Sequence, residues 1–297
     1  MSPQAKRQCA AYLMAEKEYS QRRASQLVGI SRSSIRYEPS QREGEANLRK
    51  EIRDLADRHH SYGYRRITVL MRREGSKKIN KKCVHRIWKA EGLQLPRRKP
   101  KKRRYGPKGE VIHKAERPNH VWSYDFLEDR TEKGNKLRIL TVMDEFTREC
   151  LAILVDRSIP SAQVIHLLEW LFLVHGAPEH IRSDNGPELV AQAVQDWLAQ
   201  RQCKTIYITP GSPWENPYIE SFIGKLRTEC LDRYLFVNVQ EAQEILENWR
   251  YEYNHYRPHS SLGYLTPMEF SGRCLKIPGK KEVGAFSSSE DALILSL

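Results

Sequence analysis

The sequence predicts an α/β protein in which a mixed sheet flanked by helices follows an all-helical region. Three observations support this class. Helical periodicity dominates residues 1–95, β-rich runs alternate with helical runs beyond residue 118, and a basic stretch rich in proline separates the two. We therefore expect four parts, which are a helical region at 1–95, a linker at 96–118, an α/β domain at 119–275 and a tail at 276–297.

The composition excludes several classes of protein. The 297 residues are 39% hydrophobic and 29% charged, and no run approaches the ~18 consecutive apolar residues of a membrane span. The first residues lack the apolar core of a secretory signal. The six cysteines form no CxxC pair, which disfavours both a disulfide framework and a zinc cluster. We expect a cytoplasmic protein without membrane contact.

The net charge of +13 is divided unevenly along the chain. Residues 1–118 contain 32 Lys and Arg against 12 Asp and Glu, whereas the remainder has a net charge of −7. Lys and Arg side chains placed on a nucleic-acid backbone release condensed counterions, so an excess of this size is typical of phosphate binding. The front of the chain is therefore predicted to bind nucleic acid.

Residues 20–37 have the pattern of a helix-turn-helix. Apolar residues flank Gly29, which is the expected turn, and Ser31 is placed to cap the second helix. On that helix, Arg32 and Arg36 would face a DNA groove or a phosphate group.

A second helical segment, also with helix-turn-helix character, covers residues 48–92. An apolar stripe runs through it, and Asn80 is expected to cap its last helix. Lys81, Lys82 and Arg86 lie on that helix and are predicted to contact DNA. The alternative is an ordinary basic helical bundle, and the charge excess favours the DNA-binding interpretation.

Residues 96–118 contain four prolines, two glycines and many cations, with no apolar periodicity, so they are predicted to form a linker. Two interpretations remain open. The linker is a solvated hinge, or it is a basic strap along DNA that uses Lys101, Lys102, Arg103 and Arg104.

The α/β domain begins with three β-rich runs separated by turn-like segments, which predicts adjacent antiparallel strands. The next run, 161–174, is apolar on nearly every side and should be a buried helix. The expected strands are 120–127, 137–143, 150–155, 180–183 and 205–209, and the later helices are 188–200, one that contains Glu220, and 240–256.

Three acids occupy positions suited to metal binding. Asp125 lies inside the first expected strand, Asp184 ends the fourth, and Glu220 borders the apolar stripe of its helix. Carboxylates brought together form the oxygen-rich site that Mg²⁺ prefers. Two magnesium ions there could activate a hydroxyl nucleophile and stabilise the leaving 3′ oxygen of a phosphodiester, with Mn²⁺ as a substitute.

These acids and the segments around them resemble a known family. The spacing of Asp125, Asp184 and Glu220, with 35 residues between the last two, resembles the DD(35)E signature of the retroviral-integrase superfamily. The segments SPWENPYIESFIGKLRTECL and YNHYRPHSSLGYLTP resemble the transposases of bacterial insertion sequences, specifically the OrfB-type catalytic protein of family three. The resemblance covers about residues 54–270.

The resemblance implies an RNase H-like integrase catalytic domain behind a helix-turn-helix DNA-binding region. It implies that the three acids are catalytic metal ligands in a transposase that cleaves and joins double-stranded DNA. Arg227, seven residues after Glu220, occupies the position of a basic residue that lies on the same helical face in that family. Two interpretations of Arg227 are open, contact with a DNA phosphate or an ion pair with Glu229 or another surface acid.

The resemblance also implies partners. These are the terminal inverted repeats of the element, target DNA, further copies of the chain in a homo-oligomer on DNA, and an upstream-frame protein. We expect the protein to associate with the nucleoid in the cytoplasm. Retroviral integrases carry a zinc-binding front domain, but His59, His60 and Cys83 lack its second cysteine and its spacing, so we predict no zinc.

Two other functions stay open at this point, a nuclease of similar fold that only hydrolyses DNA and a non-enzymatic DNA-binding regulator. Asp144 and Glu145 are interpreted as ordinary turn acids and not as metal ligands. Trp214, ahead of the Glu220 helix, is interpreted either as a base-stacking side chain or as a hydrophobic anchor.

Overall fold

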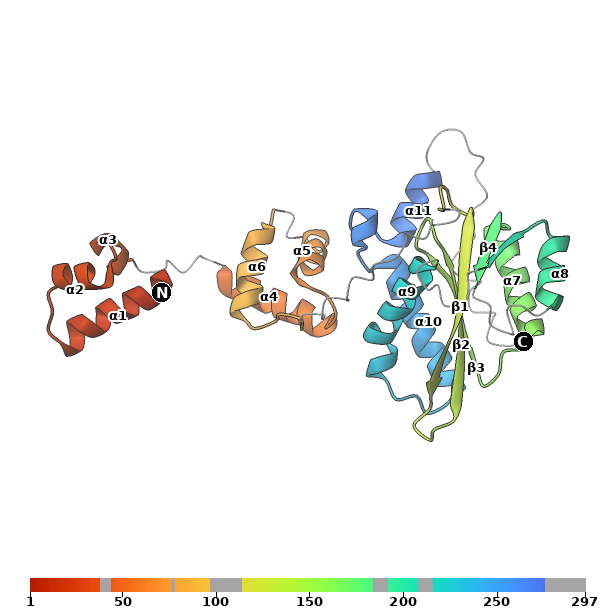
Figure 1. Cartoon of the computed structure of the whole chain (residues 1–297), viewed down its shortest axis with the longest axis horizontal. Helices are drawn as coiled ribbons and strands as arrows, with labels where there is room; N and C mark the ends of the chain where they lie inside the picture. Colours follow the sequence, from red (N-terminus) through yellow and green to blue (C-terminus); the bar gives the residue numbers. More distant parts are fainter. Residues whose placement is uncertain (38–43, 76–77, 97–113, 184–191, 208–215, 276–297) are drawn as a thin grey trace, which may run out of the picture. The chain divides into compact units, whose positions relative to one another are not determined.

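The computed structural model describes residues 1–37, 44–75, 78–96, 114–183, 192–207 and 216–275. These residues divide between two compact units, Met1–Asp54 and Leu55–Leu297 (Figure 1). Among the described helices, none combines the length and the apolar character needed to cross a membrane.

The first unit begins with α1 (Pro3–Glu16), which the sequence analysis did not predict and which contacts α2 (Gln21–Val28) and α3 (Arg32–Ile35). The predicted pair of short helices around Gly29 is confirmed. Gly29 ends α2 with a φ of 62°, a left-handed conformation that glycine adopts without strain. The Oγ of Ser31 accepts the N–H of Ser34 at 3.1 Å and so caps α3.

A longer helix, α4 (Glu45–Arg58), crosses the boundary between the units. The second unit continues with α5 (Tyr64–Arg73) and α6 (Lys81–Ala90), whose apolar side chains are buried on one face of each helix. The predicted cap is confirmed, because Asn80 Oδ1 accepts the N–H of Lys82 at 2.8 Å.

One mixed sheet of five strands forms the centre of the second unit. The strands are β1 (Val121–Arg130), β2 (Lys136–Asp144), β3 (Cys150–Asp156), β4 (His180–Ser183) and β5 (Lys204–Tyr207), in the order β3-β2-β1-β4-β5. β1, β2 and β3 are antiparallel neighbours, whereas β4 is parallel to β1 and to β5. The predicted mixed sheet and its three antiparallel strands are confirmed.

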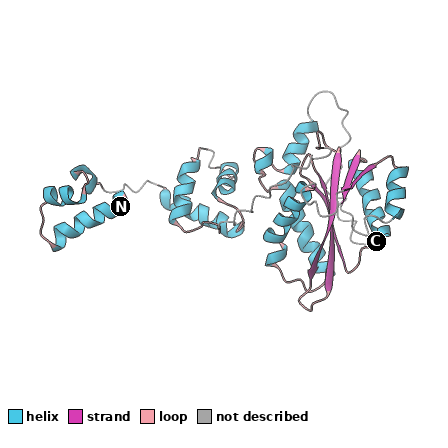
Figure 2. Cartoon of the chain, viewed as in Figure 1, coloured by secondary structure: helices cyan, strands magenta, loops and turns pink. Residues whose placement is uncertain are grey.

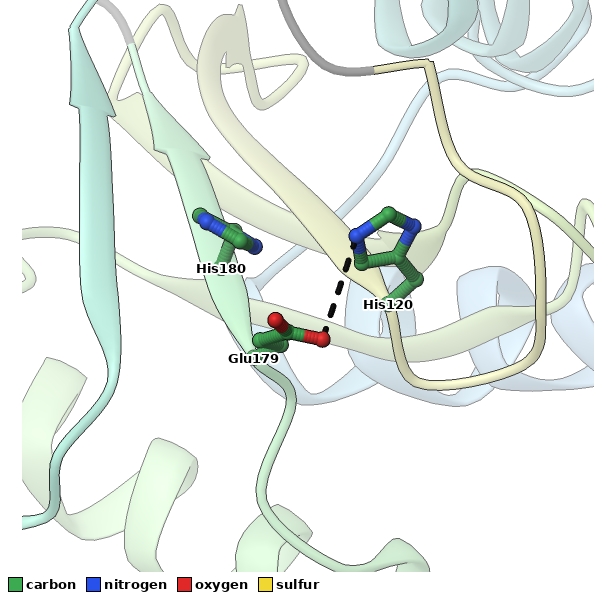
Figure 3. Close-up of side chains that lie close together, drawn as sticks. All are labelled: His120, Glu179 and His180. Atoms are coloured by element: carbon green, nitrogen blue, oxygen red, sulfur yellow. Dashed lines mark ion pairs between the residues drawn. The ribbon is translucent and has the colours of Figure 1, made fainter.

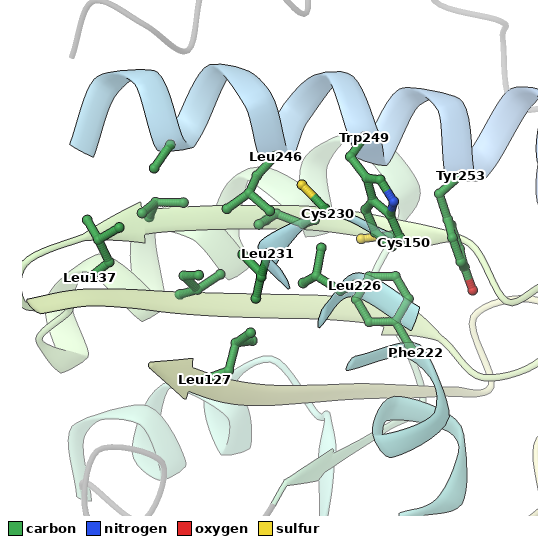
Figure 4. Close-up of a cluster of buried hydrophobic side chains, with 14 of the residues drawn as sticks. Leu127, Leu137, Cys150, Phe222, Leu226, Cys230, Leu231, Leu246, Trp249 and Tyr253 are labelled. Atoms are coloured by element: carbon green, nitrogen blue, oxygen red, sulfur yellow. The ribbon is translucent and has the colours of Figure 1, made fainter. Parts of the chain in front are cut away.

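Helices cover both faces of the sheet (Figures 1 and 2). Side chains alternate between the two faces of β1. Trp122 and Tyr124 lie on one face and pack with α7 (Ser161–His175) and α8 (Gln192–Gln200). Leu127 points to the opposite face and packs with α9 (Pro217–Glu229) and α10 (Val239–His255). In Figure 4, Leu246, Trp249 and Tyr253 of α10 point toward the strands.

The end of the described chain contains two short 3-10 helices, η2 (Leu231–Arg233) and η3 (Ser260–Leu262), and a final helix, α11 (Pro267–Leu275). The sequence analysis did not predict these elements. The prediction that α7 is buried on nearly every side is wrong, because Leu173 is 84% exposed. Only Val164, Leu168 and Leu171 of α7 are fully buried, since a helix that covers a sheet leaves its outer face in solvent.

Candidate active site

Asp125 lies in the middle of β1, where its carboxylate is half-buried. Its side chain shares a sheet face with Leu127, two residues later, and this is the face that α9 covers. The backbone around it is held firmly, because the N–H of Phe126 donates to Asp125 Oδ1 at 2.8 Å and Thr141 Oγ1 donates to the Asp125 carbonyl at 3.2 Å. The structure thus places this acid on the α9 side of the sheet.

Glu220 lies in the first turn of α9, where a negative charge is favoured by the helix dipole. The buried stripe of α9, formed by Ile219, Phe222 and Leu226, packs against the sheet and includes contacts with β1. The prediction that Glu220 borders the buried side is wrong, because its side chain is exposed. Glu220 and Asp125 therefore belong to elements that pack together on one face of the sheet.

Several predicted site residues lie outside the described residues. These are Asp184, Trp214 and the four linker cations Lys101, Lys102, Arg103 and Arg104. The described part of β4 ends at Ser183, and β4 lies beside β1 in parallel, with Arg182 opposite Ser123. The assignment of Asp184 to the site therefore stays a prediction.

A cleft of about 950 Å³ runs along α9 within the second unit. Glu220, Ser221 and Lys225 line it from α9, and Arg66 and Arg257 also line it. Burial lowers the pKa of Lys225 to about 8, with the positive charge of Arg257 as the next contribution. Lys225 Nζ donates to Ser221 Oγ at 3.0 Å. Lys225 follows Glu220 by five residues on α9, and both side chains line the cleft.

A buried ion pair fixes the far end of α9. Arg257 donates to both carboxylate oxygens of Glu229, from Nε at 2.7 Å and from an Nη at 2.5 Å. The guanidinium also lies 5.6 Å from the ring centroid of Tyr253. Burial and the charge of Arg257 lower the pKa of His259 to about 2, so its imidazole stays neutral at physiological pH. This polar cluster supports the fold and keeps α9 in place.

Asp144 and Glu145 are buried, and both have partners within the fold. Asp144 accepts the backbone N–H groups of Asn119, Phe146 and Thr147 at 2.7, 2.7 and 2.9 Å. Burial raises the pKa of Asp144, and these hydrogen bonds oppose the rise. The contacts of Asp144 agree with its interpretation as an acid of the turn, whereas Glu145 forms a buried ion pair with Arg182 of β4. An Asp at the start of a turn is itself a signal, because its side chain commonly accepts backbone N–H groups of the residues that follow.

The described residues predicted to contact DNA are exposed. Arg32, Arg36, Lys81, Lys82 and Arg86 lie in solvent on the helical region, and Arg227 lies in solvent on α9. Arg36 Nε donates to Gln21 Oε1 at 3.2 Å. Glu229, which was the alternative partner of Arg227, pairs with Arg257 instead. Exposure leaves these cations accessible to a phosphate, and their contacts with DNA stay predictions.

Three family models match the chain. An HTH-like domain matches residues 43–101, and two integrase core domain models match residues 115–213 and 201–267. Residues 43–101 contain the second predicted helix-turn-helix segment. The integrase core matches include the five strands and α9.

Curated relatives match most of the chain. An uncharacterized 39.2 kDa protein of insertion element IS476 from Xanthomonas euvesicatoria is 36% identical and covers 91% of this chain and 78% of its own length. An uncharacterized 31.7 kDa protein of insertion element IS407 from Burkholderia multivorans is 37% identical and covers 86% of this chain and 91% of its own. The putative transposase InsK of element IS150 from Escherichia coli is 29% identical over 76% of this chain and 83% of its own.

Proposed function

This chain belongs to the IS3 family of insertion-sequence transposases, and we propose that Asp125, Asp184 and Glu220 are the acids of its catalytic centre. The fold is the RNase H-like integrase core behind a helical, HTH-like region, and the chain is a transposase that integrates DNA. One observation supports the acid assignment above others. Asp125 and the helix that carries Glu220 occupy the same face of the sheet.

The donor chemistry of these residues fits a divalent metal. Asp125 is half-buried on a firmly held strand and Glu220 is exposed at a helix start, so both carboxylates are available as hard oxygen ligands. We propose that they hold two Mg²⁺ ions together with Asp184, and that Mn²⁺ substitutes. When bound, the ions would lower the pKa of a hydroxyl nucleophile and stabilise the leaving oxygen.

The remaining side chains of the site would position DNA. Lys225 and Arg227 extend from α9 beyond Glu220, where a phosphodiester directed at the acids would meet their charges. Arg32, Arg36, Lys81, Lys82 and Arg86 would hold the terminal inverted repeats, with Lys101, Lys102, Arg103 and Arg104 as a strap along the duplex. We propose domain limits at 95, 118 and 275, between the helical, linker, catalytic and tail parts.

The proposal includes an assembly. A homo-oligomer would hold the two ends of the element and the target DNA together in the nucleoid, with an upstream-frame protein as a further partner. The nuclease and the non-enzymatic regulator are the competing functions. Neither a nuclease nor a regulator would join the ends of the element to target DNA, which is the activity that family membership supports.

The test uses purified full-length chain, DNA carrying the inverted-repeat ends, and Mg²⁺. Joined strands support the transposase with these acids, nicks alone support the nuclease, and shifted bands without chemistry support the regulator. Glu220→Gln should abolish joining and leave end binding nearly unchanged. Glu244→Gln, which changes an exposed carboxylate on α10, is the matched control and should join normally. Joining by Glu220→Gln at the wild-type rate would remove Glu220 from the catalytic centre.

A further inference from the structure

Three side chains of ligand type meet at the amino ends of β1 and β4. His120 immediately precedes β1, Glu179 immediately precedes β4, and His180 is the first residue of β4. One ligand atom from each lies within 4.8 Å of the others (Figure 3). The Nε2 of His120 lies 3.9 Å from Glu179 Oε2, and the two imidazole ring centroids are 5.5 Å apart.

Backbone hydrogen bonds hold the three positions together. The N–H of His180 donates to the carbonyl of His120 at 3.0 Å, and the N–H of Glu179 donates to the carbonyl of Asn119 at 3.1 Å. On the other side, the N–H of Lys204 donates to the carbonyl of Glu179 at 3.1 Å. The distances between these side chains therefore follow from the pairing of β1, β4 and β5, and do not depend on a loop.

We propose that His120, Glu179 and His180 bind a transition-metal ion of the zinc type. Two imidazoles and one carboxylate form a three-ligand zinc set, to which water adds the fourth ligand. His180 is only 8% exposed and Glu179 is the most accessible of the three, so the metal would enter from the Glu179 side. Small side-chain rotations would shorten the separations to those of a coordinated ion.

Two existing contacts compete with the metal. Arg117 pairs with Glu179 Oε2, and the N–H of Glu116 donates to Nδ1 of His120 at 3.1 Å. Both contacts involve exposed residues, and an exposed ion pair is a weak competitor for a metal ligand. In the bound state the imidazole proton moves from Nε2 to Nδ1, Arg117 swings into solvent, and water accepts the Glu116 N–H.

This site is chemically distinct from the acid trio, and it is spatially separate from Asp125. Imidazole nitrogen favours zinc over magnesium, whereas carboxylates alone favour magnesium. At about 3.3 Å per residue, Asp125 lies roughly 16 Å along β1 from His120. The prediction of no zinc rests on the spacing of His59, His60 and Cys83, none of which belongs to this cluster.

A bound ion would fasten β1 to β4 at their amino ends. It would also release Arg117, which lies in the last part of the stretch predicted to be a linker. The proposal does not depend on the identity of the catalytic acids, because none of its three ligands belongs to the proposed acid trio.

The experiment uses full-length protein stripped with EDTA and dialysed, into which Zn²⁺ is titrated by calorimetry with Co²⁺ absorption as a second readout. The proposal expects one zinc per chain at this site and the intense visible bands of four-coordinate Co²⁺. His120→Gln, Glu179→Gln and His180→Gln should each weaken binding by at least about 100-fold, because loss of even an outer partner costs about 10–100-fold. Circular dichroism in EDTA checks that each variant is folded.

Two controls separate this site from others. Arg117→Ala removes the competing cation and should tighten zinc binding by up to about fivefold, which a cysteine site or the acid trio would not do. His166→Gln, on the exposed side of α7, should bind zinc normally, and so should Glu220→Gln. Failure of the wild type to bind zinc, or equal binding by the three ligand variants, would overturn the proposal.

Discussion

Arg182 donates from Nε to Glu145 Oε1 at 2.8 Å, and their side chains are 2% and 0% exposed. Ser123 Oγ donates to the same carboxylate oxygen. Ser123 and Arg182 lie opposite each other on β1 and β4, two residues before Asp125 and Asp184 respectively. Glu145 therefore bridges Ser123 of β1 and Arg182 of β4, the two strands that lead to the proposed catalytic aspartates.

Removing one partner of this ion pair should lower the free energy of unfolding. Arg182→Met leaves the Glu145 carboxylate buried without its cation, and the loss of unfolding free energy should be about 3–5 kcal/mol. Urea unfolding followed by tryptophan fluorescence measures it. The double variant Arg182→Met with Glu145→Leu should lose less unfolding free energy than Arg182→Met alone, because neither charge of the pair remains buried. Losses that simply add in the double variant would contradict the ion pair.

Glu149 should make stability fall as the pH rises. Burial, with the charge of Asp144 as the next contribution, raises the pKa of Glu149 from 4.5 to about 7. A carboxyl whose pKa is raised in the folded state takes up a proton on folding. Its protonated form therefore stabilises the fold below pH 4.5, and this contribution to the free energy of unfolding is lost as the pH rises through about 7. The slope should not exceed about 1.4 kcal/mol per pH unit.

Glu149→Gln tests this directly. Unfolding of the variant should depend less on pH between 5 and 8 than that of the wild type, and the variant should be the more stable of the two at pH 8. An unchanged pH profile would show that Glu149 remains ionised in the fold.

Lys225 should make DNA binding sensitive to pH. Because its pKa is lowered to about 8, the ammonium is present at pH 7 and is lost as the pH rises toward 9. Fluorescence anisotropy with an inverted-repeat duplex should show affinity falling over that interval. Lys225→Arg should keep its affinity to pH 9, since guanidinium stays protonated. Lys133→Met, in the exposed β1–β2 turn, is the control and should retain the wild-type pH profile.

The linker cations should act on all DNA sequences alike. Replacing Lys101, Lys102, Arg103 and Arg104 with Gln should lower affinity for specific and random duplexes equally. If each contacts a phosphate, the slope of log affinity against log salt should become shallower by up to about 3.6. An unchanged slope would favour the hinge interpretation.

The strands and α9 were predictable because their signals are local. Alternation in β1 and the stripe of Ile219, Phe222 and Leu226 specify an element and the face that it buries. The exposure of Leu173 was not predictable, because apolar residues lie on nearly every side of α7 and no local pattern shows which side faces solvent. The Glu145–Arg182 pair joins residues 37 apart in sequence, and no local pattern relates them.

Within the proposed site, the spacing in the sequence predicted the three acids. Only the structure shows that Asp125 lies on the face of the sheet that α9 covers. The surroundings of Glu220 differed from expectation, because Glu220 lies outside the buried stripe of α9 and its side chain is exposed. The cluster of His120, Glu179 and His180 went unnoticed, since parallel pairing of β1 and β4 brings together residues from distant parts of the chain.

The most direct measurement is anomalous X-ray scattering from a crystal of the chain with an inverted-repeat end and Mn²⁺. The expected result is manganese density bonded to carboxylate oxygens of Asp125, Asp184 and Glu220, beside the scissile phosphate. Manganese bound elsewhere, with the Glu220 carboxylate directed away from an ordered DNA end, would contradict the assignment of these acids.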